Sequence, residues 1–356
     1  MHSFIYQGMP SRVVFGAGKL NALADEITLL GAHRALILTT PGQQPLGQRI
    51  VDLLGERSAG IYPKAVMHVP IDVARAARAE AVRLGADCCV AIGGGSTIGL
   101  GKAIAMDSGL PILAIPTTYA GSEMTTIYGL TEHRRKNTGR DPRVLPRTVI
   151  YDPELMLSLP ADISAASGMN AMAHAVEALY ADDTNPIISL MAEESIQALA
   201  ESLPQVVRNP QDVDARARSL YGAWLAGICL GSVGMAIHHK LCHTLGGTFN
   251  LPHAQAHAAV LPHTAHYNHQ AAASALSRAA RALGGEHSED VGALLFELNR
   301  QLGIEPALSA IGLPEGGPAE TARIAGASPY SNPRPFEQDA IEAMLTRALH
   351  GHPPAC

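Results

Sequence analysis

Short apolar runs alternate with segments of helical period over the first 155 residues of the chain. The runs are ALILTT (35–40), VMHV (66–69), CCVAIG (88–93), ILAIP (112–116) and TVIY (148–151). They are separated by segments of helical periodicity near 43–55, 72–85 and 96–107. This alternation is typical of βαβ units, whose strands form one parallel sheet. We therefore predict an α/β domain over 1–155, with ligands bound beyond the carboxyl ends of its strands.

The strand pattern ends after Tyr151-Asp152-Pro153, and Ala-, Leu- and Met-rich helical patterns continue to the end of the chain. Pro and Gly clusters interrupt them at 204–210, 252, 312–318 and 329–335. We therefore predict an all-helical domain over 156–356. Its most apolar stretch, from Ala223 to Ile237, is shorter than the ~18–20 residues of a membrane span, which predicts a buried helix.

Composition narrows the class of protein. The 356 residues carry 26 Lys+Arg and 32 Asp+Glu, a formal net charge of −6, and 47% of them are apolar. With one Trp and 4% aromatic residues, the chain lacks the basic face and the stacking rings that nucleic-acid binding requires. We expect a compact enzyme that does not bind nucleic acid.

The cysteines and the N-terminus bear on location. Five cysteines, an odd number without a CxxC pair, favour a reducing compartment. The first residues, MHSFIYQGMPSRVVFG, lack the charged and apolar regions of a signal peptide. We expect a cytoplasmic protein that does not enter a membrane.

A glycine loop follows one of the predicted strands, where CCVAI leads into Gly93-Gly94-Gly95-Ser96-Thr97 and then a helical segment. Glycine lets the backbone approach a ligand closely, and the amides that open a helix attract an anion such as pyrophosphate. Neither G-x-G-x-x-G nor the Walker A pattern is met, which argues against ATP or GTP hydrolysis. An ordinary strand-to-helix turn is the alternative reading of this loop.

Hydroxyl side chains follow two other predicted strands at the same edge of the sheet. Thr39 and Thr40 stand where many nicotinamide sites place an acid that repels a 2′-phosphate, so NADPH is not excluded. These two threonines could equally form only a cap or a turn. With the glycine loop, the predicted cofactor residues are Thr39, Thr40, Gly93, Gly94, Gly95, Ser96, Thr97, Thr117, Thr118 and Ser122.

Half of the 16 histidines lie in one tenth of the chain: His238, His239, His243, His253, His257, His263, His266 and His269. His239 and His243 share a helix face, as do Asn170 and His174, so two helices could present converging ligands. The His-Glu-x-x-His motif of metalloproteases is not met, because Lys240 follows His239. A structural role is the default for His257, His263, His266 and His269.

The motifs GGGST, PTTYAGSE, NAMAHAVEA, HHKLCHTLGG, LPHA and LPH follow one another in this order. In this order and at these separations they resemble the iron-containing (group III) alcohol dehydrogenase family across essentially the whole chain. The resemblance implies a Rossmann-like dinucleotide-binding domain followed by an all-α domain, as in dehydroquinate synthase-like folds. It also implies an oxidoreductase that uses NADH or NADPH.

Metal-dependent members of that family hold one divalent ion with an aspartate and three histidines. By motif, the histidines fall on His174, His239 and His253, whereas the aspartate position is Asn170. A neutral amide in place of a carboxylate removes one negative charge from a site meant for a dication. We expect a vestigial site and an activity that does not strictly require metal, although three histidines and a water can bind zinc.

Further stretches resemble one branch of the family: EMTTIYGLTE, KNTGRDPRVLPRTVIYDP, SGMNAMAHAVEALYA and SNPRP. That branch reduces the carbon–carbon double bond of an unsaturated oxo-dicarboxylate during bacterial degradation of aromatic compounds. We expect His243 to be the general acid or enolate stabiliser, assisted by His253, while Asn170, His174 and His239 shape the substrate pocket.

A dicarboxylate substrate needs local positive charge in a net negative protein. The candidates are Lys136, Arg140, Arg143 and Arg334, and a solvated loop is the alternative for the basic stretch around Lys136. The assembly we expect is a homodimer, the commonest one. Two other functions compete: a metal-dependent alcohol or polyol dehydrogenase on the same fold, and a non-catalytic metal- or nucleotide-binding module.

Overall fold

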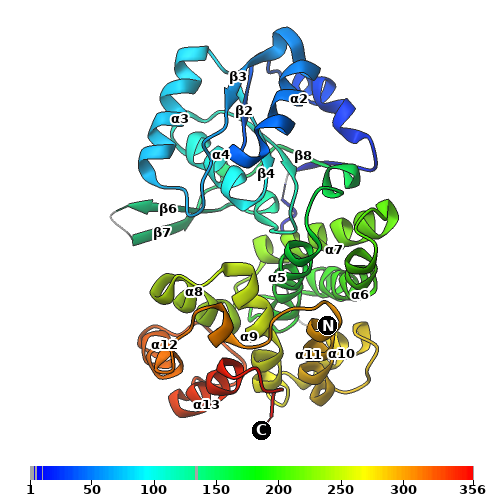
Figure 1. The fold of residues 1–356 in the computed structure, drawn as a ribbon, viewed down its shortest axis with the longest axis vertical. Coiled ribbons are helices and arrows are strands. Elements are labelled where there is room, and N and C mark those ends of the chain that lie inside the picture. The colour runs from blue at the N-terminus through cyan, green and yellow to red at the C-terminus, as the bar shows by residue number, and fades with distance from the viewer. Residues whose placement is uncertain (1–3, 5, 10, 133–134, 356) are drawn as a thin grey trace. The chain divides into compact units, whose positions relative to one another are not determined.

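The computed structural model describes residues 4, 6–9, 11–132 and 135–355, and only the backbone of residues 135 and 136. The chain forms two compact units (Figure 1). Residues 8–159 form the first, which we call the α/β unit. Residues from 160 onward, with the described residues before position 8, form the second, which we call the helical unit. The predicted fold class, a parallel-sheet domain and an all-helical domain, is confirmed.

A six-stranded sheet, entirely parallel, is the centre of the α/β unit, in the order β1-β8-β5-β4-β2-β3. Its strands are β1 (Arg12–Phe15), β2 (Ala35–Leu38), β3 (Ser58–Tyr62), β4 (Cys88–Gly93), β5 (Ile112–Pro116) and β8 (Thr148–Tyr151). Its helices are α1 (Leu23–Leu29), α2 (Gln44–Leu54), α3 (Ile71–Leu84) and α4 (Gly95–Ser108). The strand order reverses between β2 and β4, and a ligand crevice is expected beyond the carboxyl ends of these two strands.

The sheet is buried on both faces, which is why its strands are nearly continuous apolar runs rather than alternating ones. All four residues of β2 and all six of β4 are buried. On one face, Ile37 and Val90 pack with Leu23 of α1 and Ile50 of α2. On the other face, Gly101 of α4 lies close enough to Ala91, Ile112 and Leu38 that a side chain there would touch all three. Helices therefore cover both faces of the sheet.

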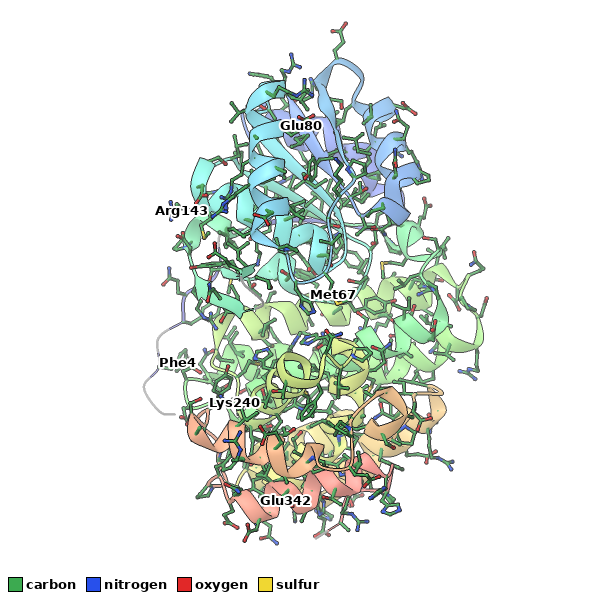
Figure 2. All side chains as sticks on the ribbon, turned by 60° about the vertical axis from the view of Figure 1, so that its left-hand side comes forward. Phe4, Met67, Glu80, Arg143, Lys240 and Glu342 are labelled. Carbon is green, nitrogen blue, oxygen red and sulfur yellow. The ribbon has the colours of Figure 1, made fainter. Side chains whose placement is uncertain are left out.

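One predicted strand is wrong: residues 66–69 form a turn that leads into α3. His68 and Val69 have φ values of 65° and 43°, and Met67 is 64% exposed on this loop (Figure 2). The strand lies instead at β3, which the sequence analysis missed. Its pairing with β2 shifts register between Ala35 and Leu36, so the irregular edge strand SAGIY lacks a clean apolar pattern.

A two-stranded antiparallel sheet was also not predicted. Strand β6 (Ile127–Glu132) pairs with β7 (Arg135–Arg140), and Ile127 lies opposite Arg140. Only one residue of β6 is buried, so the apolar pattern of a core strand is absent. The basic stretch that the sequence suggested as a loop is therefore mostly a strand.

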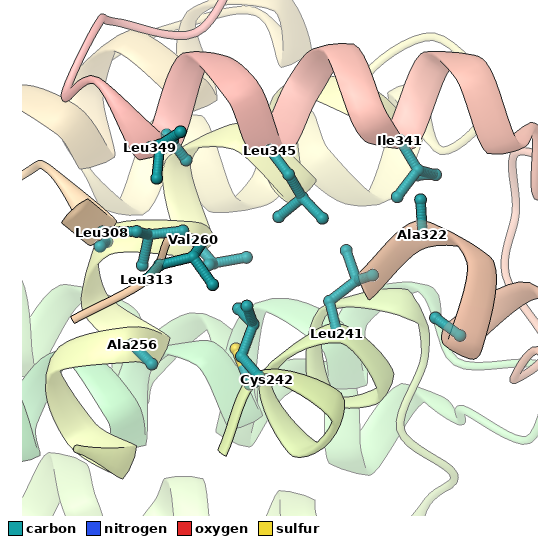
Figure 3. Packing of buried hydrophobic residues seen from close by; sticks show 14 of the residues in the cluster. Leu241, Cys242, Ala256, Val260, Leu308, Leu313, Ala322, Ile341, Leu345 and Leu349 are labelled. Carbon is teal, nitrogen blue, oxygen red and sulfur yellow. The ribbon is translucent and has the colours of Figure 1, made fainter. Parts of the chain in front are cut away.

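The helical unit consists of nine α-helices among the described residues. They are α5 (Ala161–Tyr180), α6 (Pro186–Arg208), α7 (Val213–Ser232), α8 (Ile237–Phe249), α9 (His253–Asn268), α10 (Ala273–Ala282), α11 (Val291–Gln301), α12 (Gly317–Ala327) and α13 (Gln338–Leu349). One core of this unit joins α8, α9, α12 and α13, with Leu241, Val260 and Leu345 all fully buried in it (Figure 3).

The stretch from Ala223 to Ile237 is not the single helix that we predicted, because α7 ends at Ser232 and α8 begins at Ile237. Within the described part of the chain, no single helix has the length and apolarity to cross a membrane. The bent pair α7 and α8, which meet at 94°, meets that criterion only when the two are taken together, by length and composition.

Acid should destabilise the helical unit through His263 on α9. His263 is 2% exposed, and burial, followed by the charge of Arg347, lowers its pKa to about 4 from the usual 6.5. As the pH falls below 6.5 the unfolded chain takes up the proton first, so stability is lost between pH 6.5 and 4. Between pH 7 and pH 5, the free energy of unfolding of the wild type should therefore fall by about 2 kcal/mol more than that of His263→Gln.

Chemical denaturation at the two pH values measures this difference, and His287→Gln, at an exposed histidine, is the matched control. Equal pH slopes for the wild type and His263→Gln would contradict the assignment.

Candidate active site

Three helices bring the predicted histidines together. Helix α5 contributes His174, α8 contributes His239 and His243, and α9 contributes His253 at its first residue. The rings form a connected chain, with centroid distances of 5.1 Å from His174 to His239 and 5.9 Å from His239 to His243. The rings of His243 and His253 are stacked at 6.3 Å. We call these four residues and Asn170 the histidine cluster.

Burial divides the cluster into two parts. Asn170, His174 and His239 are 5%, 3% and 4% exposed, whereas His243 and His253 are exposed in the helical unit. Burial, followed by the neighbouring His239, holds the pKa of His174 well below its usual range, so this ring is neutral at physiological pH. Of the cluster, His243 and His253 are the imidazoles able to exchange protons with solvent.

A fully buried carboxylate, Glu177, organises the deep part of the cluster. Its Oε2 accepts hydrogen bonds from His239 Nδ1 at 2.6 Å and from Ala236 N at 3.0 Å. Its Oε1 accepts from His238 N at 2.7 Å. Because His239 Nδ1 is hydrogen-bonded to Glu177, the other ring nitrogen, Nε2, faces away from this carboxylate. Within the described part of the chain, His239 Nε2 and Asn170 Oδ1 have no hydrogen-bond partner.

Sequence reasoning missed Glu177 and the contacts of His257. Glu177 lies three residues after His174 on α5, so the helical period of NAMAHAVEA placed it beside the cluster. The ring of His257 lies 4.3 Å from that of His253 and 4.9 Å from that of His239. His257, for which the sequence indicated a structural role by default, is therefore in direct contact with the histidine cluster.

In the α/β unit, the glycine loop follows β4 at the reversal of strand order. Gly93 has a φ of 147°, and a Cβ there would lie 2.5 Å from Thr97 Oγ1. Gly94 precedes the first residue of α4, Gly95, and no side chain caps this N-terminus of the helix. The first amides of a helix lack partners one turn back; Thr97 N donates to Gly94 O at 3.1 Å, so the amides of Gly95 and Ser96 are the ones available to an anion.

The hydroxyl groups around this loop differ in what they can do. Thr39 is fully buried, and its Oγ1 donates to Thr40 O at 2.8 Å, so this hydroxyl is used internally. This bond agrees with the turn role that the sequence left open for Thr39, and its contact with a cofactor stays a prediction. Thr117 Oγ1 accepts from Gln43 Nε2 at 2.8 Å, and this glutamine was not predicted.

The remaining predicted hydroxyls lie around the same loop. Ser96 is half-buried, Thr97 Oγ1 is buried without a described partner, and Thr118 lies 3.0 Å from the position of a Cβ on Gly94. Ser122 begins a short 3-10 turn, η4 (Ser122–Met124), downstream of β5.

A buried lysine ties α4 to the chain that follows η4. Lys102 Nζ donates to Thr125 O at 2.8 Å, Thr125 Oγ1 at 2.9 Å and Ile127 O at 2.7 Å. Burial lowers the pKa of Lys102 to about 7, although Glu123 opposes the shift. All three Nζ donors are used, so Lys102 holds the scaffold of the loop.

The predicted basic residues belong to different units: Lys136, Arg140 and Arg143 to the α/β unit and Arg334 to the helical unit. Arg334 lies over the Tyr267 ring at 4.1 Å and lines a cavity of about 940 Å³ with Arg347 in the helical unit. The substrate role of Arg334 stays a prediction. Arg143 is paired with Asp141, Arg140 ends β7, and the side chain of Lys136 lies outside the described residues.

The chain as a whole matches one family. The family described as iron-containing alcohol dehydrogenase matches residues 10–153, and its C-terminal part matches residues 164–349. The chain therefore belongs to the iron-containing alcohol dehydrogenase family, as its motifs predicted.

Its relatives specify a branch of this family. The chain is 56% identical to maleylacetate reductase of Burkholderia cepacia, with both chains covered completely. It is 54% identical to maleylacetate reductase of Sphingobium indicum, over 99% of each chain. Among solved structures, maleylacetate reductase from Agrobacterium tumefaciens superposes with a TM-score of 0.96 at 49% identity, over 99% of this chain and 100% of the other.

The family's metal site does not fit the residues found here. No carboxylate occupies the Asn170 position, and both oxygens of the adjacent Glu177 already accept hydrogen bonds. The rings of His174 and His239 are stacked, with centroids 5.1 Å apart and 30° between their planes. In the part of the chain that the structure describes, His174, His239 and His253 do not form a set of donor atoms within 4.8 Å of one another.

The three donors that Glu177 satisfies make its replacement costly. Glu177→Gln turns one acceptor into an NH₂ group that faces an N–H donor, so it should reduce the free energy of unfolding by about 2–4 kcal/mol. Urea denaturation measures this loss. The control is Glu201→Gln, at a half-exposed carboxylate that should cost less than about 0.5 kcal/mol. A buried Glu177→Gln variant as stable as this control would contradict the role assigned to the carboxylate.

Proposed function

We propose that the chain reduces maleylacetate to 3-oxoadipate with NADH or NADPH, in bacterial degradation of aromatic compounds. The observation that carries the proposal is 56% identity to a maleylacetate reductase over the full length of both chains. The replacement of the family's aspartate by Asn170, and the exposed pair His243 and His253, agree with this chemistry. A metal-dependent alcohol or polyol dehydrogenase needs an ion that this cluster is poorly arranged to hold.

The cofactor site that we propose lies beyond the carboxyl ends of β2 and β4. The pyrophosphate would lie on the first amides of α4, where Gly94 and Gly95 let the backbone approach it. The 2′ position of the ribose would lie near Thr40, where no acid repels a phosphate, so both NADH and NADPH are substrates.

Reduction of a conjugated double bond requires less stabilisation of negative charge by the protein than reduction of an isolated ketone. Bound at the glycine loop, a reduced nicotinamide would supply a hydride to the alkene carbon that is β to the ketone of the substrate, and the π electrons would move onto the ketone oxygen as an enolate. One proton then adds to the α-carbon, which gives 3-oxoadipate and the oxidised cofactor. The enolate charge is delocalised, so hydrogen bonds and one acid are sufficient without a Lewis acid.

The cluster supplies these roles as follows. His243 donates the proton or the hydrogen bond to the enolate, since it is exposed and can be reprotonated from solvent. His253, stacked on His243, assists it. Asn170, His174 and His239 form the deep wall of the pocket, with His239 oriented by Glu177. Lys136 and Arg140 are our candidates for binding a substrate carboxylate.

Three further points complete the proposal. We propose a dinucleotide-binding domain at 1–155 and a domain with the histidine cluster at 156–356. We also propose a homodimer, the commonest assembly, in the cytoplasm. Turnover should not require metal, because the delocalised enolate can be stabilised by hydrogen bonds and one acid.

The direct experiment follows absorbance of the reduced cofactor with freshly generated maleylacetate, using NADH and NADPH in turn, and identifies the product by mass spectrometry. We expect oxidation of both cofactors and one 3-oxoadipate per cofactor consumed. Oxidation with simple aldehydes but not with maleylacetate would contradict the proposal in favour of an ordinary alcohol dehydrogenase. No oxidation with any substrate would favour a non-catalytic module.

Removing the proposed acid should slow the chemical step. His243→Ala should lower kcat by about 10²–10⁴-fold, the usual contribution of a positioned general acid. His287→Ala, another exposed histidine, serves as the control and should retain wild-type kcat. If His243→Ala retains full kcat as well, the acid is not His243, and His253 is the next residue to substitute.

Adding one methyl group at the glycine loop should weaken cofactor binding without disturbing the fold. A Cβ on Gly95 has ordinary contact only with Ala120, at 3.8 Å, whereas one on Gly94 would press on Thr118 at 3.0 Å. Gly95→Ala should therefore fold normally and raise the Kd for NADH about tenfold or more, since the methyl group occupies space at the pyrophosphate.

Fluorescence titration with NADH measures this Kd. Gly316→Ala, where a Cβ meets nothing within 4 Å, is the matched control. An unchanged Kd in a correctly folded Gly95→Ala protein would remove the loop from the cofactor site.

A further inference from the structure

We propose that His238, Cys242 and His257 form a second metal site, for a soft or borderline d¹⁰ ion such as Cu(I) or Zn(II). None of these residues belongs to the family's set of ligand positions, which fall on Asn170, His174, His239 and His253. In the described part of the chain, these three alone form a group of His, Cys, Asp or Glu donor atoms within 4.8 Å of one another.

The helices bring the three donors to one point. His238 and Cys242 are four residues apart and share a face of α8, and His257 faces them from α9. His238 Nε2 lies 3.0 Å from His257 Nδ1 and 3.7 Å from Cys242 Sγ. These separations are close to those between ligand atoms that share one ion at Zn–N and Zn–S bonds of roughly 2.0 and 2.3 Å. Little movement is needed to accommodate an ion.

Hydrogen bonds prepare His238 as a ligand. Thr264 Oγ1 donates its own proton to Leu261 O at 3.1 Å or Val260 O at 3.3 Å, so it accepts from His238 Nδ1 at 3.0 Å. Protonation at Nδ1 leaves the lone pair of Nε2 directed at His257 and Cys242. A histidine whose second nitrogen is held in this way is the usual arrangement around a bound metal.

Charge and ligand type select the ion. A thiolate with two imidazoles is a soft donor set, which suits Cu(I) and Zn(II) and disfavours Mg²⁺ or Ca²⁺. Burial raises the pKa of the Cys242 thiol well above its usual range, so an ion must displace the proton as it binds. Glu177, fully buried and close enough to affect this thiol, places a negative charge beside the ion.

An ion bound at this second site should affect the neighbouring histidine cluster through His257. An ion bound to His257 Nδ1 breaks its hydrogen bond to His238, and the His257 ring packs on His253. If the proposed function holds, the loaded protein should reduce maleylacetate more slowly than the metal-free protein. Metal content and spectra are measured without substrate, so the site is tested even if the activity is not maleylacetate reduction.

The experiment loads reduced, chelator-treated full-length protein anaerobically with Cu(I), as its acetonitrile complex, or with Zn(II), over hours because the donors are buried. After desalting, the metal content per chain is measured by mass spectrometry. We expect one ion per chain in the wild type and none in Cys242→Ser or Cys242→Ala, both checked for folding by circular dichroism. With Co(II) as a probe, the wild type should show a thiolate charge-transfer band that the Cys242 variants lack.

Matched variants distinguish the site from other donors. Cys229→Ser changes another buried cysteine in the helical unit and should retain the ion. His174→Gln removes one of the family's ligand positions and should also retain it. Thr264→Val should lower the affinity for the ion by about 10–100-fold through the lost second hydrogen bond. A wild type that retains no ion, Cys242 variants that retain it, or loss of the ion in His174→Gln would each overturn the proposal.

Discussion

The arrangement of the histidine cluster depends on one buried carboxylate, Glu177. Burying a carboxylate without hydrogen-bond donors costs several kcal/mol, so Glu177 must be paired with donors. It finds three of them where α8 begins: the amides of Ala236 and His238 and the ring of His239. These bonds fix the first turn of α8 against α5 and determine which nitrogen of His239 faces away from the carboxylate. His238 lies in this first turn of α8, and His243 lies one turn further along. The residue at which α8 begins therefore determines where both side chains lie.

This constraint explains how a metal-binding architecture can persist without its charged ligand. With Asn170 in the aspartate position, Glu177 is the carboxylate in contact with the cluster, and its oxygens are already occupied. Among the deep residues, burial holds the pKa of His174 well below its usual range, and Glu177 orients His239. His243 and His253 are the exposed pair of the cluster. A conjugated substrate fits such a site, because its enolate needs donors rather than an ion.

The sequence was informative where periodicity was strong. The buried strands β2, β4, β5 and β8 and the helices that carry the cluster were predicted from apolar runs and from i, i+4 spacing. It was not informative at β3, whose irregular edge pairing hides the apolar pattern, or at β6 and β7, which contribute little to a core. In the site, Gln43 was missed because its partner Thr117 lies 74 residues away in sequence. The spacing from His174 placed Glu177 on the cluster side of α5, but its role was missed because its donors lie about 60 residues away.

The central claim is that this cluster supports reduction without a resident ion. The most direct measurement is the rate of maleylacetate reduction by wild type and by Asn170→Asp, each with its metal content per chain determined before and after exhaustive chelation. We expect that the wild-type rate does not fall when the metal is removed, and that the restored carboxylate increases metal content without increasing the rate. A wild-type rate that falls in proportion to metal content, and returns with added iron or zinc, would contradict it.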